Sequence, residues 1–246
     1  VMTSQSERLG QWMQWDDSYQ TMSAENNYTI WHFLKVCHER GWIYQGTDVM
    51  PWCTRCGTGL SQQEIVTEGY QDIVHPGLSV KFPIEGRPGE SLLIWTTTPW
   101  TLTSNVAAAV NPSLTYIKVR QGDERLYLAK GRLGELDGEF ETEAECLGSD
   151  LVGLRYQAPF YDLPVQQGVE HRVIAWDQVG SEEGTGIVHI APGAGAEDFV
   201  LGNEQGLAVI APLDEFGDFK EGFGLLEGVN VFDAQKIIFN ELRIKG

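Results

Sequence analysis

The N-terminal part of the chain carries a helical repeat of apolar positions. Between residues 24 and 40, apolar side chains recur three and four positions apart, at Ile30, Trp31, Leu34 and Cys37. This spacing predicts one helix with an apolar face. Ser23 precedes the segment as a suitable N-cap residue, and Gly41 follows it as a suitable terminator.

Beyond Val66 the pattern changes to that of β-structure. Short apolar and β-branched runs alternate with Gly, Pro and Asp turns, at residues 92–97, 105–110, 115–119, 125–129, 172–176, 186–191 and 208–211. Many short strands at such spacing predict a barrel or a sandwich. A last helix is expected after Asp233, with Ile237, Ile238 and Leu242 facing inward. The pattern therefore predicts an α+β, mainly β fold.

The chain is strongly acidic. Its 246 residues include 17 Lys and Arg against 35 Asp and Glu, a net charge of −18. This balance excludes a broad basic surface for nucleic acid. We find no run of about 18 apolar residues and no cationic start before an apolar stretch, so we expect no membrane span and no secretory signal. Four cysteines in a chain of this length predict a reducing, cytoplasmic location.

The acidity is uneven along the chain. Residues 1–66 hold seven acids and four bases, whereas residues 67–246 hold 28 acids and 13 bases. Such a shift in composition marks a domain boundary, which we place near residues 60–75.

A threonine-rich segment ends one predicted strand. In Trp95-Thr96-Thr97-Thr98-Pro99-Trp100-Thr101-Leu102, Thr96 and Thr98 point to one side of a strand and Thr97 to the other, before Pro99 ends regular pairing. Hydroxyls and freed amides at a strand end can orient a water or bind a carbonyl oxygen. The alternative is a β-prone strand that runs into a turn.

A second segment joins a strand, a glycine-rich loop and two acids. Residues 184–199, GTGIVHIAPGAGAEDF, carry His189 on the strand, Gly193 and Gly195 in the loop, and Asp198 near a helix start. Glycines let a substrate approach the backbone, and a carboxylate beside the loop can hold an ammonium group. Alternatively, His189 is a core residue and Asp198 is only a favourable charge at a helix N-terminus.

Cys53 and Cys56 form a CxxC pair between Pro51 and Gly57, which resembles a zinc knuckle. One pair supplies two ligands, whereas a structural zinc site uses about four. The partner ligands therefore lie outside this chain, or the pair holds no metal. Turn residues on both sides argue against a thioredoxin-like redox pair.

Together these segments resemble the isoleucyl-tRNA synthetases. WTTTPWTLTSNVAAAV and GTGIVHIAPGAGAEDF resemble the two signature stretches of that family's editing domain, and LAVIAPLDEFGDF resembles a third. VMPWCTRCGTGLS is similar to the segment that precedes this insertion, and LGQWMQWDDSYQTMSAENNYTIWHFLKVCHERGWIYQG resembles the end of the first half of the catalytic domain. The Thr98-Pro99-Trp100 sequence favours the isoleucyl type, because valyl and leucyl relatives typically have Arg after the threonines.

The resemblance implies three parts. Residues 1–50 correspond to the edge of the Rossmann-type catalytic domain, residues 51–66 to a zinc-knuckle-like connection, and residues 67–246 to a barrel-like editing domain (CP1) that ends in a helix. The family's two ATP-site signatures and its second CxxC are absent from this sequence. We therefore expect a fragment that does not aminoacylate, with ATP, Mg²⁺ and a structural Zn²⁺ belonging to a longer parent and no cofactor needed for editing.

The family's editing residues map onto this chain by position. Catalytic positions correspond to Thr96, Thr97, Thr98 and Asp198, and substrate-binding positions to Trp95, Thr101, Asn105, His189, Gly193 and Gly195. Asp198 matches the acid that holds the α-ammonium group of the substrate, and His189 matches the histidine that shapes side-chain recognition. Two positions depart from the family: Thr103 replaces a common Pro, and Ala194 replaces a bulkier residue.

The implied reaction is hydrolysis of the ester that links valine to tRNA(Ile). Valine differs from isoleucine by one methylene, and isoleucyl-tRNA synthetase is itself the standard example of an enzyme that needs a second sieve for this reason. The implied partners are the valine-carrying 3′ end of tRNA(Ile) and the rest of a synthetase that ligates isoleucine to tRNA with ATP. The alternatives are a valyl- or leucyl-type editing domain and a non-catalytic, acidic β-rich binding module.

Overall fold

The computed structural model describes residues 2–15, 17, 19–66, 70, 77–182 and 184–245. The chain divides into two compact units, Val1–Thr47 and Asp48–Gly246. The predicted start of the editing segment, residue 67, lies outside the described residues.

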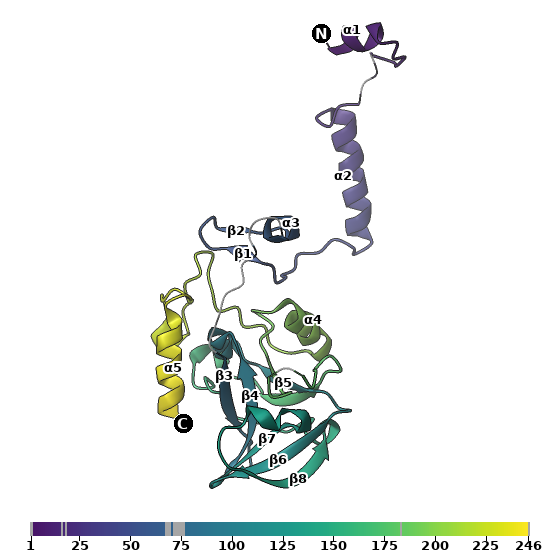
Figure 1. Ribbon diagram of the computed structural model, residues 1–246. Coiled ribbons are helices and arrows are strands. Elements are labelled where there is room, and N and C mark those ends of the chain that lie inside the picture. The colour runs from purple at the N-terminus through teal and green to yellow at the C-terminus, as the bar shows by residue number, and fades with distance from the viewer. Residues whose placement is uncertain are drawn as a thin grey trace. The chain divides into compact units, whose positions relative to one another are not determined.

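The first unit contains two helices, α1 (Met2–Arg8) and α2 (Ala24–Glu39) (Figure 1). The predicted helix is confirmed as α2. Its N-terminus is capped because the hydroxyl of Ser23 accepts a hydrogen bond from the backbone N–H of Asn26 at 3.2 Å. Gly41 follows the helix with a left-handed φ of +71°. On the predicted apolar face Cys37 is buried, whereas the other members are exposed: Ile30, Trp31 and Leu34.

The second unit begins with a small hairpin that carries the CxxC pair. Strand β1 (Trp52–Cys53) pairs with β2 (Thr58–Gly59) in antiparallel fashion. The short helix α3 (Gln62–Glu64) follows, and its start is a capping box in which Ser61 and Glu64 satisfy each other's backbone amides.

A five-stranded sheet forms the larger layer, in the order β3-β4-β7-β6-β8. Its strands are β3 (Leu78–Pro83), β4 (Glu90–Thr96), β6 (Thr115–Gln121), β7 (Glu124–Ala129) and β8 (Glu141–Leu147). The β4–β7 pair is parallel and the others are antiparallel. Our sequence prediction missed both edge strands, β3 and β8.

A three-stranded sheet holds β5 (Ala107–Val110) between β10 (Val188–Ile190) and β9 (Arg172–Ala175). Every residue of β5 is buried. Ala107 and Ala109 pack with Leu201 of helix α4 (Ala196–Gln205), and the alternate residues belong to the main core. The alternating faces of one strand thus join the helix to the core.

The predicted strand at 208–211 is wrong, because these residues are irregular. Ile210 is nevertheless buried in the main core, so the apolar run reflects burial rather than pairing. The last helix is confirmed as α5 (Ala234–Lys245), in which Ile238 is fully buried. Short 3-10 helices complete the fold: η2 (Pro99–Ser104), η3 (Lys130–Glu135), η4 (Gly148–Asp150), η5 (Pro164–Gln166) and η6 (Gly224–Leu226).

The mainly β, α+β class is confirmed. Within the described residues each sheet is open, so the barrel-like description is loose. The same part of the chain contains no helix with the length and apolar character of a membrane span.

Ion pairs join elements of the larger sheet that are mostly not adjacent in the strand order. Arg125 Nε lies 2.9 Å from Glu143, Lys118 Nζ lies 3.2 Å from Glu90, and similar pairs join Lys81 to Glu124 and Lys130 to Glu145. Most lysines and arginines of the chain lie within ion-pair distance of a carboxylate in this way.

Candidate functional site

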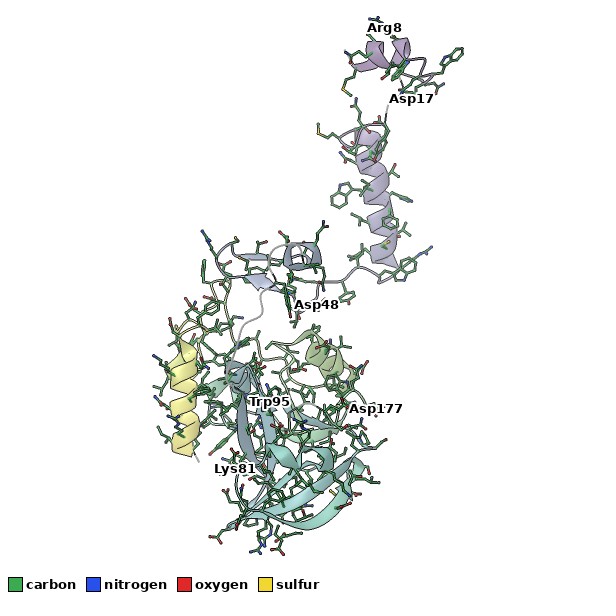
Figure 2. All side chains as sticks on the ribbon, viewed as in Figure 1. Arg8, Asp17, Asp48, Lys81, Trp95 and Asp177 are labelled. Atoms are coloured by element: carbon green, nitrogen blue, oxygen red, sulfur yellow. The ribbon has the colours of Figure 1, made fainter. Side chains whose placement is uncertain are left out.

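A cavity of about 500 Å³ lies at the end of β4. The sequence-predicted residues that line it are Trp95, Thr96, Thr97, Thr98, His189 and Asp198. Trp95 is labelled in Figure 2. Side chains from β4, from β10 and from the first turn of α4 therefore meet in one place. About ninety positions of the sequence separate β4 from the other two elements.

The threonine turn is fixed by its own hydrogen bonds. The hydroxyl of Thr96 accepts a bond from the backbone N–H of Thr98 at 3.1 Å, and the hydroxyl of Thr101 donates to the carbonyl of Thr98 at 2.7 Å. Pro99 starts η2 directly after β4, which ends strand pairing at this point. Thr96 is buried, whereas Thr97 and Thr98 are exposed. The turn thus presents two hydroxyls to the cavity.

His189 is anchored to this turn. Its Nε2 lies 3.0 Å from the hydroxyl oxygen of Thr101. Because that hydroxyl already donates to Thr98, the oxygen must accept, which assigns the ring proton to Nε2. Nδ1 is then a bare acceptor, and it is buried with no hydrogen-bond partner among the described residues. Burial lowers the pKa of His189 to about 4, so the ring is neutral near pH 7.

Asp198 lies in the first turn of α4 and faces the cavity. Its Oδ2 accepts a hydrogen bond from the backbone N–H of Ala191 at 2.8 Å, and no described residue bonds Oδ1. Burial raises the pKa of Asp198, while the Ala191 amide opposes that shift. A half-buried carboxylate with one free oxygen is suited to a cationic group.

The loop glycines have different surroundings. A Cβ on Gly193 would lie 1.9 Å from the carbonyl oxygen of Ile210, so this glycine is needed for close packing of two backbones. Gly193 and the departing residue Ala194 line a separate cavity of about 650 Å³. Gly195 is the N-cap of α4, and a Cβ there would lie 3.1 Å from Cγ of Asp198. Gly195 therefore borders the carboxylate directly.

Asn105 belongs to a buried polar network at the end of η2. Its side chain accepts a hydrogen bond from the hydroxyl of Tyr156 at 2.8 Å and donates to the carbonyl of Ala107 at 2.8 Å. Gln166 donates to the backbone carbonyls of Thr103 and Asn105. This network supports the end of η2, and Asn105 is not among the cavity-lining residues. Thr103 supports the same turn, since its hydroxyl donates to the carbonyl of Trp100 at 2.8 Å.

Sequence reasoning missed much of the cavity wall. The additional lining residues are Trp176, Gln178, Val179, Gly180, Glu182, Gly184, Thr185, Ile187 and Val188. Glycines just before the strand that carries His189 were a usable signal, because glycine-rich segments often border binding sites. The residues at 176–182 offered no comparable motif.

The cysteine pair forms a tight turn. The Cys53 sulfur accepts a hydrogen bond from the backbone N–H of Cys56 at 3.4 Å. This bond lowers the pKa of the Cys53 thiol, whereas the neighbouring Cys53 side chain raises the pKa of Cys56. Among the described residues no group of three or more His, Cys, Asp or Glu could hold a metal ion. Among the described residues the pair can therefore offer only two of the about four ligands that a structural zinc site uses.

Comparisons with known proteins agree across the chain. The family model for tRNA synthetases class I (I, L, M and V) matches residues 1–232. Isoleucine–tRNA ligases from Methanothermobacter thermautotrophicus and Pyrococcus abyssi are 43% and 42% identical over 100% of this chain. The chain spans 23% and 24% of the length of these two relatives. The solved structure of GlLeuRS-CP1 has a similar fold, with a TM-score of 0.57 and 15% identity over 69% of this chain and 96% of that chain.

Proposed function

This chain belongs to the class I tRNA synthetases of the isoleucine, leucine, methionine and valine group, and we propose that its second unit is an editing site that hydrolyses the ester of valyl-tRNA(Ile). The observation that carries the proposal is the cavity in which Thr96–Thr98, His189 and Asp198 meet. The reaction adds water to the ester carbonyl and releases valine and the 3′-terminal ribose hydroxyl.

Asp198 holds the α-ammonium group of the aminoacyl ester. Its free Oδ1 accepts a charge-assisted hydrogen bond, and the Ala191 amide fixes the direction of the carboxylate through Oδ2. This contact places the ester carbon relative to the threonine turn. Positioning of this kind converts binding energy into rate.

The threonine turn orients the ester and the attacking water. Thr97 and Thr98 present hydroxyls at the cavity, and Thr96 holds the Thr98 amide in place. The described lining residues include no neutral base with a pKa near 7, because His189 has a pKa of about 4. We therefore assign activation of the water to hydroxyls of the turn and of the substrate ribose.

His189 gives the pocket its shape. Its ring is neutral and fills part of the space for the amino-acid side chain. A pocket limited by ring and indole walls accepts the valyl group and excludes the larger isoleucyl group. Such size exclusion is how a second site corrects errors of one methylene.

Deacylation of preformed aminoacyl-tRNAs tests the proposal. We expect this chain to hydrolyse Val-tRNA(Ile) faster than Ile-tRNA(Ile). Asp198→Asn should lower kcat/KM by about 10- to 100-fold, the range for a lost hydrogen bond to a charged group. The matched control is Glu197→Gln, because Glu197 lies in the same helical turn but does not line the cavity.

Each outcome separates the alternatives. Equal activity in wild type and Asp198→Asn would refute the assignment of the site. Preferential hydrolysis of Thr-tRNA(Val) or of mischarged tRNA(Leu) would indicate a valyl- or leucyl-type editor. Absence of hydrolysis with every charged tRNA, both by this chain and by a full-length synthetase that contains it, would favour a binding module.

A further inference from the structure

Residues 180–182 and 184 form a wall of the cavity that few hydrogen bonds hold in place. Gly180, Glu182 and Gly184 line the cavity directly. Upstream, the side chain of Asn111 donates to the carbonyl of Val179 at 3.1 Å, and downstream the backbone N–H of Ala129 donates to the carbonyl of Thr185 at 2.9 Å. Between these two points, the described residues of the wall make hydrogen bonds only to Arg132.

Arg132 lies on η3, outside the cavity, and reaches the wall with two different nitrogens. Its Nε donates to the carbonyl of Gly184 at 2.7 Å, and its Nη1 donates to the carbonyl of Glu182 at 2.9 Å. The third nitrogen, Nη2, pairs with Glu135 of the same 3-10 helix. The side chain is 23% exposed, which limits competition from water. One planar guanidinium thus bridges two carbonyls of the wall, a geometry that Lys cannot reproduce.

The wall also packs against an aromatic side chain that lines the same cavity. Gly184 has a left-handed φ of +57°, and a Cβ there would lie 2.8 Å from the Trp95 ring. The position of the Trp95 ring at the cavity therefore depends on where the Gly184 backbone is held. The side chain of Arg132, on η3, holds this backbone through its hydrogen bond to the Gly184 carbonyl.

We propose that Arg132 is a positioning residue that fixes the backbone of Glu182 and Gly184 beside Trp95 and thereby sets the size limit of the pocket for the acyl group. This inference rests on the proposed function, because size selection has meaning only if the cavity binds an aminoacyl ester. Arg132 does not touch that ester; it acts through the two carbonyls that it bridges.

The test compares Arg132→Met and Arg132→Lys with two controls. Glu135→Gln removes the ion partner and leaves both carbonyl bonds in place. Arg155→Met removes exposed ion pairs to Glu85 and Glu170, and Arg155 does not line the cavity. The measurements are KM and kcat for Val-tRNA(Ile) and Ile-tRNA(Ile), together with the NMR order parameters of the backbone amides of residues 180–182 and 184 and of β6.

We expect Arg132→Met to raise KM for Val-tRNA(Ile) at least fivefold and to raise Ile-tRNA(Ile) hydrolysis relative to valine at least fivefold. Arg132→Lys should rescue neither value, and both controls should match wild type. The order parameters of residues 180–182 and 184 should fall in both Arg132 variants while those of β6 stay unchanged. Equal losses on both substrates, or lower order parameters in β6 as well, would show a general loss of stability and overturn the proposal.

The proposed function and the positioning role of Arg132 can be refuted separately. A wild-type protein that hydrolyses no aminoacyl-tRNA would overturn the proposed function and the selectivity role together. The order parameters would still decide whether Arg132 holds the wall. Unchanged order parameters of residues 180–182 and 184 in Arg132→Met would overturn the positioning role even if the wild type is active.

Discussion

The hydroxyl of Thr101 lies 3.0 Å from Nε2 of His189 and donates its own proton to the carbonyl of Thr98. Thr101 therefore connects β10, which carries His189, to the turn that contains Thr98. It also fixes the ring as the neutral tautomer with its proton on Nε2. The ring beside the cavity is consequently neutral rather than positively charged.

Thr101→Val should remove the hydrogen bond to His189 while it keeps the volume of the side chain. Loss of the accepting oxygen leaves the Nε2 proton unpaired, so we expect KM for Val-tRNA(Ile) to rise about 3- to 10-fold. Thr101→Ser should restore it. Nitrogen NMR of the wild-type ring should show one protonated nitrogen and no titration between pH 6 and 8, since the pKa is about 4. Unchanged ring shifts and KM in Thr101→Val would contradict the assignment.

Asp198→Asn should stabilise the fold at neutral pH while it removes activity. Burial raises the pKa of this carboxyl, so the folded protein holds the proton to a higher pH than the unfolded chain does. Its contribution to stability is therefore present at low pH and is lost as pH rises through the folded pKa. Melting temperatures of both proteins from pH 3 to 8 should diverge with rising pH, in favour of Asn. A wild type that gains on the variant with rising pH would contradict this sign.

The same shift affects catalysis in the opposite direction. The proposed ammonium contact needs the ionised carboxylate, so deacylation should fall as pH drops toward the raised pKa. The acid limb of the kcat/KM profile should lie above the pH expected for an exposed aspartate.

Gly193→Ala and Gly195→Ala form a matched pair with different expected defects. The first would force a Cβ against the Ile210 carbonyl, so we expect a loss of about 1–3 kcal/mol of unfolding free energy, the usual cost of overpacking. The second has a φ of −124° that alanine accepts, and its Cβ would press on Asp198. Gly195→Ala should therefore keep most stability and lose activity. Denaturant melts and deacylation assays distinguish the two, and the reverse ranking would contradict the geometry.

Zinc-binding measurements should show that the cysteine pair alone is an incomplete zinc site. Two thiolates bind zinc weakly, so we expect this chain to lose added zinc on dialysis and a full-length parent to retain one equivalent. Cys53→Ser should abolish the residual binding. Because the Cys56 amide lowers the pKa of Cys53, iodoacetamide should alkylate Cys53 before Cys56. Tight stoichiometric zinc in this chain alone would show that further ligands lie within it.

Local patterns predicted the elements with strong periodicity. Helix α2 has a capping serine and a terminating glycine that bracket its apolar face, and β4 and β6 are apolar enough to be recognised. The edge strand β8 was missed because its glutamates at every second position resemble an exposed loop. Those glutamates are explained only by their basic partners on β6, β7 and η3.

The candidate site was predictable where the residues form contiguous motifs. The two motifs around Thr97 and His189 indicated the residues that line one cavity. The supporting contacts were not predictable, because Arg132, Tyr156 and Gln166 act through backbone carbonyls or a buried amide far along the chain. Such contacts produce no recognisable spacing of residues in the sequence. The roles assigned to Asn105 and Gly193 in substrate binding remain predictions.

The ion pairs between strands determine how this domain responds to ionic strength. Most of its cations are already neutralised by neighbouring carboxylates, so an RNA strand that approaches meets a surplus of unpaired acids. Most RNA-binding proteins lose affinity steeply as salt rises because they displace counterions from phosphates. Here added salt screens repulsion instead, so the affinity of this chain for an isolated 3′ strand should change little, or even increase, between low and physiological salt.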